Sequence, residues 1–191
     1  LAARSLESGV ELSGAESIFI VHRVLLALSA LHGMADAAGR VLGYVHGDVG
    51  HDRVFVCPDG QVKLDCLFAG NQRLHQVRTA TIASREQSLR VSPEQVQGRS
   101  VDGRADIFNA AVMLVELFIR RPLFIGPSQL STLLAIRDVR LDVLEANRQR
   151  LPPRMEPVLR RALAKDPGER YSGADEMAEL LAPFFGALSG E

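Results

Sequence analysis

Tryptophan is absent from this 191-residue sequence, and tyrosine and phenylalanine occur only 2 and 8 times. Aliphatic side chains must therefore form most of the core, and a surface that stacks on bases or sugars is not expected. The two cysteines, Cys57 and Cys66, have the spacing of neither a disulfide framework nor a metal site. This usage is typical of the reducing cytoplasm, where we expect the protein to reside.

An excess of charge of either sign is also absent, because 22 Lys and Arg residues face 23 Asp and Glu residues and leave a net charge of -1. A chain without a long-range field does not attract nucleic acid or an anionic membrane surface, so neither is expected as a partner. The first residues lack the basic start and apolar run of a signal peptide. The strongest apolar stretch, Ile107–Ile119, is too short to span a membrane and contains Glu116, so it is expected to be a buried core helix.

The length predicts one domain over residues 1–191, and the start at Leu1 without an initiator methionine suggests a piece of a larger protein. Apolar residues at helical spacing predict a long helix over Glu16–His32, followed by a linker over residues 33–43. Residues 69–90 have no periodicity and are expected to form a long irregular loop. From Asp102 onward the pattern is helical, and the helix at 105–120 is apolar on every face, which predicts a central position. The helices predicted in this part span Ala105–Arg120, Ser128–Asp138, Pro157–Ala164 and Ser172–Phe185.

Short β-branched runs lie between the first helix and the irregular loop. They predict strands at Tyr44–Val45, Val54–Val56 and Val62–Leu64. The last two runs flank Pro58-Asp59-Gly60, which is typical of a tight turn because proline presets φ and glycine tolerates positive φ. We therefore expect a small hairpin over residues 54–64.

Several motifs follow one another in a distinctive order. His46-Gly47-Asp48 precedes the hairpin with its turn "PDGQVKL", and "VSPEQVQG", "VDGRADIFNAAVMLVELFIRRPLF" and "LRRALAKDPGERYSGADEMAELL" come next. Over nearly the whole chain this order resembles the C-terminal lobe of bacterial Hanks-type Ser/Thr protein kinases. The resemblance implies a mainly α (α+β) fold with a small β-hairpin at the catalytic-loop position. The N-terminal lobe, with its Gly-rich loop and lysine, has no counterpart in these residues.

The resemblance also implies two structural contacts. Glu94, in the "SPE" string, is expected to pair with Arg170, in the "GERY" string, and to fix the end of the loop to the helical part. Asp106 is expected to cap the backbone around His46 from the central helix. Both roles concern the fold and are independent of activity.

The chemistry of the family needs an aspartate base, Mg²⁺ ligands and phosphate-binding cations. In "HGDVGHDRVFV", Asp48 keeps the position of the base and His46 keeps that of its anchor. Arg53 stands at the position of the metal-binding asparagine, and a guanidinium cannot ligate a metal. Gly50 stands where many kinases carry a phosphate-contacting lysine, and Gly47 replaces the arginine that receives a phosphorylated loop.

The second metal-binding position is also changed. Counting in register from Asp48 and from the hairpin turn places Cys66-Leu67-Phe68 at the Asp-Phe-Gly motif, so the carboxylate is missing. A slip of one residue offers Asp65 instead, but a slip in a strand turns every side chain to the opposite face. Mg²⁺ prefers hard oxygen ligands, so Cys66 is interpreted as a small buried residue.

These changes favour a pseudokinase: an inactive kinase-like module that acts through protein interactions in signalling, with no metal site and no cofactor. The alternative is one half of a divergent but active ATP-dependent Ser/Thr kinase, which would need ATP and Mg²⁺. Leu1, Ala2, Val54 and Val56 belong to the face that meets the N-terminal lobe in a kinase. Without that lobe the face is expected to be an exposed apolar patch, which predicts a protein partner or self-association.

Overall fold

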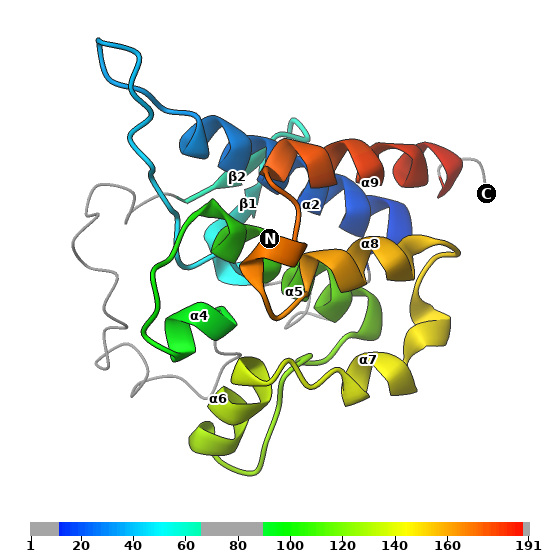
Figure 1. Cartoon of the computed structure of the whole chain (residues 1–191). Coiled ribbons are helices and arrows are strands. Elements are labelled where there is room, and N and C mark those ends of the chain that lie inside the picture. Colours follow the sequence, from blue (N-terminus) through cyan, green and yellow to red (C-terminus); the bar gives the residue numbers. More distant parts are fainter. Residues whose placement is uncertain (1–11, 66–89, 189–191) are drawn as a thin grey trace.

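The computed structural model describes residues 12–65 and 90–188, and its centre is helix α5 (Gly103–Ile119). Nearly all side chains of α5 are buried, as the apolar pattern predicts. In Figure 1, helices α2 and α9 lie along one side of α5, α8 lies beside it, and α4, α6 and α7 lie on the opposite side. Asp102 caps the first turn by accepting from the Arg104 N–H, and Arg120 ends the helix in the left-handed conformation.

Helix α2 (Gly14–His32) packs along α9 (Ala174–Leu188) and against α5. It begins at a capping box in which Ser13 accepts from the Glu16 N–H and the Glu16 carboxylate accepts from the Ser13 N–H. The edge of the Phe19 ring meets Phe185 of α9 at a centroid distance of 5.9 Å. The predicted helix over 16–32 is thus present, extended by one turn or less at its start.

Helix α2 is the one helix within 12–65 and 90–188 that is long and apolar enough to cross a membrane. Core helices of globular proteins also meet these criteria of length and apolar composition. Of its most apolar window, 44% is buried inside the fold, and Ile18, Val21, Leu25 and Leu28 are fully buried there. We describe α2 as a core helix.

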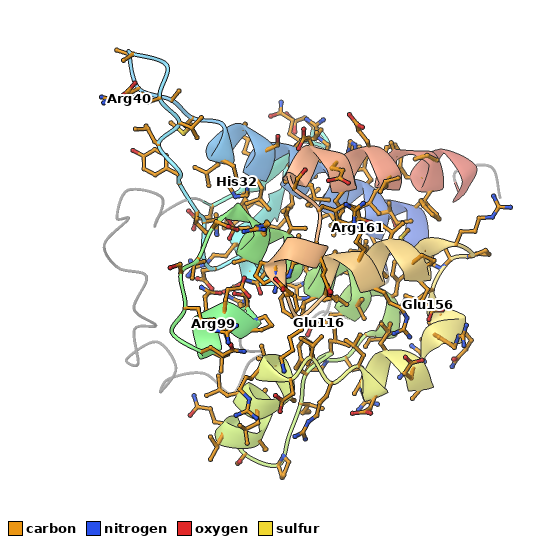
Figure 2. All side chains as sticks on the ribbon, viewed as in Figure 1. His32, Arg40, Arg99, Glu116, Glu156 and Arg161 are labelled. Atoms are coloured by element: carbon orange, nitrogen blue, oxygen red, sulfur yellow. The ribbon has the colours of Figure 1, made fainter. Side chains whose placement is uncertain are left out.

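Strands β1 (Val54–Val56) and β2 (Val62–Leu64) form the predicted hairpin, with Val54 opposite Leu64 in antiparallel register. Gly60 has a φ of 80°, which explains the glycine in the turn. The strand predicted at Tyr44–Val45 is absent. The N–H of His46, which follows it, donates to the Asp106 side chain of α5. The β-bridge in this region pairs Ala35 with Val41, in the preceding linker. That linker projects from the body of the fold, with Arg40 at its tip (Figures 1 and 2).

The second half of the chain is helical, as predicted, with boundaries shifted by one to three residues. Two short helices, α4 and α7, were not predicted, because four or five residues are too few to show a period. The remaining elements are α4 (Pro93–Val96), α6 (Gln129–Arg137), α7 (Asp142–Ala146), α8 (Met155–Ala162) and the 3₁₀ turns η1 (His51–Arg53), η2 (Arg148–Arg150) and η3 (Pro167–Glu169). The expected fold class, mainly α with one small hairpin, is confirmed.

The apolar patch expected around β1 needs a correction. Val54 is 1% exposed and belongs to the core, Val56 is half-buried, and the exposed side chain of this strand is Phe55, at 51%. Val54 and Val56 share one face of β1, but this face packs on the core, and Phe55 lies on the opposite, exposed face. Leu1 and Ala2 lie outside the described residues.

Candidate functional site

Asp48 lies in the loop between α2 and the hairpin, and an arginine of the same loop holds its carboxylate. Arg53 ends η1, and its Nε and Nη2 donate to Asp48 Oδ2 at 2.9 and 2.6 Å. The side chains of Arg53 and Asp48 are 20% and 28% exposed, so water reaches the pair only in part. Arg53 Nη1 also lies 3.7 Å from Asp65 Oδ2, so one guanidinium joins two carboxylates.

These carboxylates keep Arg53 protonated. Burial alone would lower the pKa of Arg53, but the hydrogen bond and charge of Asp48, together with the charges of Asp52 and Asp65, raise that pKa above its usual value. A fixed positive charge therefore lies between Asp48 and Asp65 at physiological pH.

A second arginine, Arg90, contacts the same loop. Its Nη1 lies 3.5 Å from Asp48 Oδ1, and its Nη2 forms an ion pair with Asp52 Oδ1 at 2.6 Å. Arg53 contacts the Oδ2 atom of Asp48 and Arg90 contacts its Oδ1 atom. Both oxygens of the Asp48 carboxylate are therefore engaged with guanidinium groups.

Asp106, in the first turn of α5, fixes the backbone that leads into this loop. Its fully buried carboxylate accepts from the backbone N–H groups of His46 and Gly47, both at 2.8 Å. His32 Nε2 lies 2.8 Å from Asp106 Oδ2, and Figure 2 labels His32 at the end of α2 that lies beside α5. Gly47 has a φ of 75°, a conformation that glycine adopts without strain.

His46 joins the two sides of the loop. It is 3% exposed, its Nδ1 accepts from the Asp48 N–H at 3.3 Å, and its Nε2 lies 2.6 Å from the carbonyl oxygen of Asp65. The N–H of Asp65 donates to the carbonyl oxygen of Arg53. The start of the loop and the end of β2 are thus held at a fixed separation.

Glu94 and Arg170 come together in a second, more deeply buried site. Arg170 Nη1 and Nη2 donate to Glu94 Oε1 and Oε2 at 2.8 and 2.9 Å, and the two side chains are 0% and 5% exposed. Arg170 also donates to the carbonyl oxygens of Arg104, Ala164 and Lys165. One side chain therefore ties α4, the start of α5 and the end of α8 to the segment before α9.

Comparison with known proteins places this geometry in a family. No protein-family model matches the chain. The chain is 30% identical to the tyrosine-protein kinase MasK of Myxococcus xanthus over 100% of its own length and 31% of MasK. It is 31% identical to the serine/threonine-protein kinase PknL of Mycobacterium tuberculosis over 84% of its length and 40% of PknL. The solved kinase domain of PknI of the same organism matches with a TM-score of 0.66 and 26% identity, over 97% of this chain and 62% of that one.

The chain belongs to the bacterial Hanks-type protein kinases. Its mainly helical fold with one hairpin corresponds to their C-terminal lobe, as the resemblance implied. It spans less than half the length of the curated kinases just described.

The described residues include only the start of the segment where the Asp-Phe-Gly motif is expected. Cys66, Leu67 and Phe68 lie outside the described residues, and the choice between Cys66 and Asp65 at the metal position stays a prediction. Asp65 is described, and its carboxylate faces the Arg53 guanidinium.

The donor set does not fit the Mg²⁺–nucleotide site of an active kinase. That site needs carboxylate and amide oxygens free to bind two metal ions. Arg53, which the resemblance aligns with the amide ligand, and Arg90 contact both oxygens of Asp48. Across the described parts of the chain, no group of three or more His, Cys, Asp or Glu side chains is arranged to hold a metal ion.

Sequence reasoning missed four contacting side chains: Arg90, His32, His51 and Glu116. His51 Nε2 lies 3.1 Å from Glu116 Oε2, while Glu116 Oε1 accepts from the N–H of Leu123. Figure 2 shows Glu116 inside the fold on α5. In the sequence, His32 and His51 show no ligand pairing at helical or hairpin spacing, which favours a surface or core position for each. The pairs His32–Asp106, His51–Glu116 and Arg90–Asp48 each join residues more than 40 positions apart, so no local pattern signals them.

Proposed function

We propose that this chain is a catalytically inactive kinase domain, a pseudokinase, that acts as a protein-interaction or regulatory module in bacterial signalling. One observation carries the proposal: the Arg53 guanidinium donates twice to the Asp48 carboxylate, at 2.9 and 2.6 Å, from the position of a metal ligand. A base that is held by a cation of its own chain is not available to an incoming hydroxyl.

Charge placement supports the same conclusion. In an active kinase two dications neutralise the phosphates beside the base. Here Arg53, whose pKa is raised, occupies the space between Asp48 and Asp65. A dication placed there would face a permanent positive charge at a few ångströms, where repulsion amounts to several kcal/mol even at an effective dielectric constant of about 20.

The interaction role is supported by what the chain retains. The Glu94–Arg170 pair and the Asp106 contacts, which hold the fold together, are complete, whereas the groups that would bind metal and phosphate are replaced. A kinase fold that keeps its structural contacts but lacks its catalytic groups acts through the surface that it presents to other proteins. We propose a protein partner or a second copy of this chain as the ligand of that surface, in the cytoplasm.

A second candidate rests on Asp65. Its carboxylate lies in the same cluster as Asp48, 3.7 Å from Arg53, so a rotation of Arg53 would leave two carboxylates facing one space. The chain would then be half of a divergent ATP-dependent kinase and would require a nucleotide-binding lobe. This candidate demands that Arg53 abandon two short hydrogen bonds, which makes the pseudokinase the better supported proposal.

The test is a thermal-shift titration with ATP and Mg²⁺ or Mn²⁺, run beside a radiolabel transfer assay on the longest available form of the protein. A true ligand at a hundredfold excess over its Kd stabilises a protein by about 2.7 kcal/mol. We expect no metal-dependent stabilisation, and none after the single changes Arg53→Asn or Cys66→Asp. Stabilisation of that size, abolished by Asp48→Ala or Asp65→Ala, would establish the second candidate instead.

A further inference from the structure

Exposed arginines gather where three segments in the second half of the chain meet. Arg150 Nη1 donates to the carbonyl oxygen of Ile119 at 3.3 Å, so η2 lies at the C-terminal end of α5. Arg148 Nη2 lies 3.2 Å from Glu156 Oε2, so η2 also reaches the first turn of α8. Four exposed arginines at this junction are called here the arginine surface: Arg121, Arg148, Arg150 and Arg154.

The local charge is strongly positive, although the chain as a whole is nearly neutral. Residues 147–161 contain five arginines and one glutamate, whereas the net charge of the chain is -1. That glutamate, Glu156, accepts from Arg160 Nε at 2.8 Å, and Glu145 of α7 also pairs with Arg160. The hydrogen bond from Arg160 lowers the pKa of Glu156, so its carboxylate is ionised and already has a partner.

Three of the four arginines keep their charge uncompensated. Within residues 12–65 and 90–188, no carboxylate pairs with Arg121, Arg150 or Arg154, and the guanidinium of Arg150 bonds a backbone carbonyl oxygen. Only Arg148 shares a carboxylate, that of Glu156. The arginine surface therefore presents guanidinium N–H donors to an acidic group from outside the fold.

The backbone at Arg154 shows that the fold itself does not call for an arginine there. Arg154 precedes α8 with a φ of 67°, a left-handed conformation that costs a side-chain-bearing residue energy and that glycine adopts freely. Its side chain forms no cap hydrogen bond for the helix that it precedes. A residue held in such a conformation without a structural contact points to a function for its side chain.

We propose that the arginine surface binds an acidic segment of a partner protein, a run of aspartate and glutamate side chains. The proposal rests on the interaction role proposed above and names the class of partner. The planar fork of a guanidinium binds a carboxylate through two parallel hydrogen bonds, and arginine is enriched in protein interfaces for this reason.

Two other anionic partners fit this surface less well. Residues 147–161 contain no aromatic side chain on which a base could stack, so a single-stranded nucleic acid would find charge alone. A membrane-binding surface also inserts apolar side chains into the lipid. The large apolar side chains beside these arginines, Leu151 and Met155, are buried in the core.

The first experiment measures binding of a fluorescein-labelled polyglutamate peptide by anisotropy, with the protein in its longest available form. A peptide of about eight residues reaches roughly 25 Å when extended, enough to contact several arginines. Each arginine removed should weaken binding about two- to fivefold, as for exposed ion pairs, so Arg121→Gln/Arg154→Gln should weaken it by about 4- to 25-fold. Added salt should weaken binding to the unmodified protein.

The matched control is Arg23→Gln/Arg99→Gln, which removes the same charge from two exposed arginines elsewhere. Figure 2 shows Arg99 beside α4 and Glu156 at the opposite side of the view. The control should bind polyglutamate within about twofold of the unmodified protein, because a distant exposed charge is screened. An equal loss in both double variants, or no binding by the unmodified protein, would overturn the proposal.

The second experiment separates binding from folding at one residue. Arg154→Gly should keep or raise the melting temperature, because glycine takes the positive φ without strain, and should still weaken polyglutamate binding about two- to fivefold. A lower melting temperature with unchanged binding would show that Arg154 serves the fold, and would overturn the proposal.

The third experiment offers the rival anions, a single-stranded oligothymidylate and vesicles of phosphatidylserine and phosphatidylcholine. Polyglutamate should bind more tightly than either. Tighter binding of one of them, lost in Arg121→Gln/Arg154→Gln, would overturn the assignment to an acidic protein segment. Metal-dependent stabilisation by ATP would contradict the pseudokinase function without changing polyglutamate binding, so the two proposals fail separately.

Discussion

Two arginine–carboxylate pairs of this chain, Glu94–Arg170 and Asp48–Arg53, differ in how deeply their side chains are buried. At Glu94–Arg170 the side chains are 5% and 0% exposed, and the guanidinium has protein acceptors for its bonds in three segments. At Asp48–Arg53 the side chains are 28% and 20% exposed. A fully buried charge is costly without its partner, whereas a partly exposed charge can be solvated by water when the partner is removed. Under the proposed pseudokinase function, this difference explains how catalytic groups are replaced while the architecture stays intact.

Removal of a partner at the buried site should have the largest effect. Glu94→Ala leaves the Arg170 guanidinium buried without its counter-charge, and we expect a loss of about 3–5 kcal/mol in the free energy of unfolding, measured by urea titration. Glu94→Gln, which keeps the shape and one acceptor, should lose less. A Glu94→Ala protein that unfolds at the same urea concentration as its parent would show that the site is not structural.

The next largest effect is expected at Asp106, whose carboxylate receives backbone N–H groups of His46 and Gly47 and lies beside His32. In Asp106→Asn, an NH₂ group replaces one of the two acceptor oxygens and faces a backbone N–H donor. Loss of a charged acceptor costs about 1.5–3 kcal/mol for each bond, so we expect a total near the upper end of that range. Hydrogen exchange of the His46 and Gly47 amides should become faster in the variant, and unchanged exchange would contradict the role assigned to Asp106.

The fold could be predicted from the sequence because its signals are local. The apolar period of residues 16–32, the Pro58-Asp59-Gly60 turn and the all-round apolar helix at 105–120 each report on their own backbone. The failed strand at Tyr44–Val45 shows the limit. β-branched residues favour extended backbone, but whether that backbone pairs as a strand depends on a partner elsewhere, and here Asp106 takes the N–H groups that follow it.

The site could be predicted in part. The motif strings predicted the Glu94–Arg170 pair, which the structure shows. They placed Asp48 at the position of the base and Arg53 at that of a metal ligand, but the contact between the two was not predicted. Arg90 carried no signal, because its meaning depends on the space that Gly50 leaves 40 residues earlier, where a Cβ atom would lie 2.0 Å from Arg90 Cδ. Empty space made by a glycine is visible only when the chain is folded.

At the partly exposed Asp48–Arg53 site, the expected effect is smaller than at Glu94–Arg170 or Asp106. Arg53→Met removes the guanidinium and keeps much of its apolar stem, and the pair is open enough that we expect a loss of at most about 1 kcal/mol. Asp48 then keeps Arg90 as a partner, which limits the cost further. A loss as large as that of Glu94→Ala, measured in the same urea titration, would show that burial does not separate the two sites.

The smallest effect is expected at a third site, Arg137–Asp138, where the arginine is 44% and the carboxylate 29% exposed. Asp138 follows α6, and the hydrogen bond from Arg137, with the charge of Lys165, lowers its pKa from 3.8 to about 2. Because the folded state holds this proton more weakly than the unfolded state, the contribution is present above about pH 4 and is lost as the pH falls toward 2. A ¹³C NMR titration of the carboxyl group should show the low pKa, and added salt should raise it by screening the arginine. Asp138→Asn removes this contribution, so it should flatten the stability profile between these pH values and lower stability at pH 7 by a small amount, because solvent screens the pair. A pKa at or above 3.8, or a loss at pH 7 comparable to that of Arg53→Met, would contradict the order of the three sites.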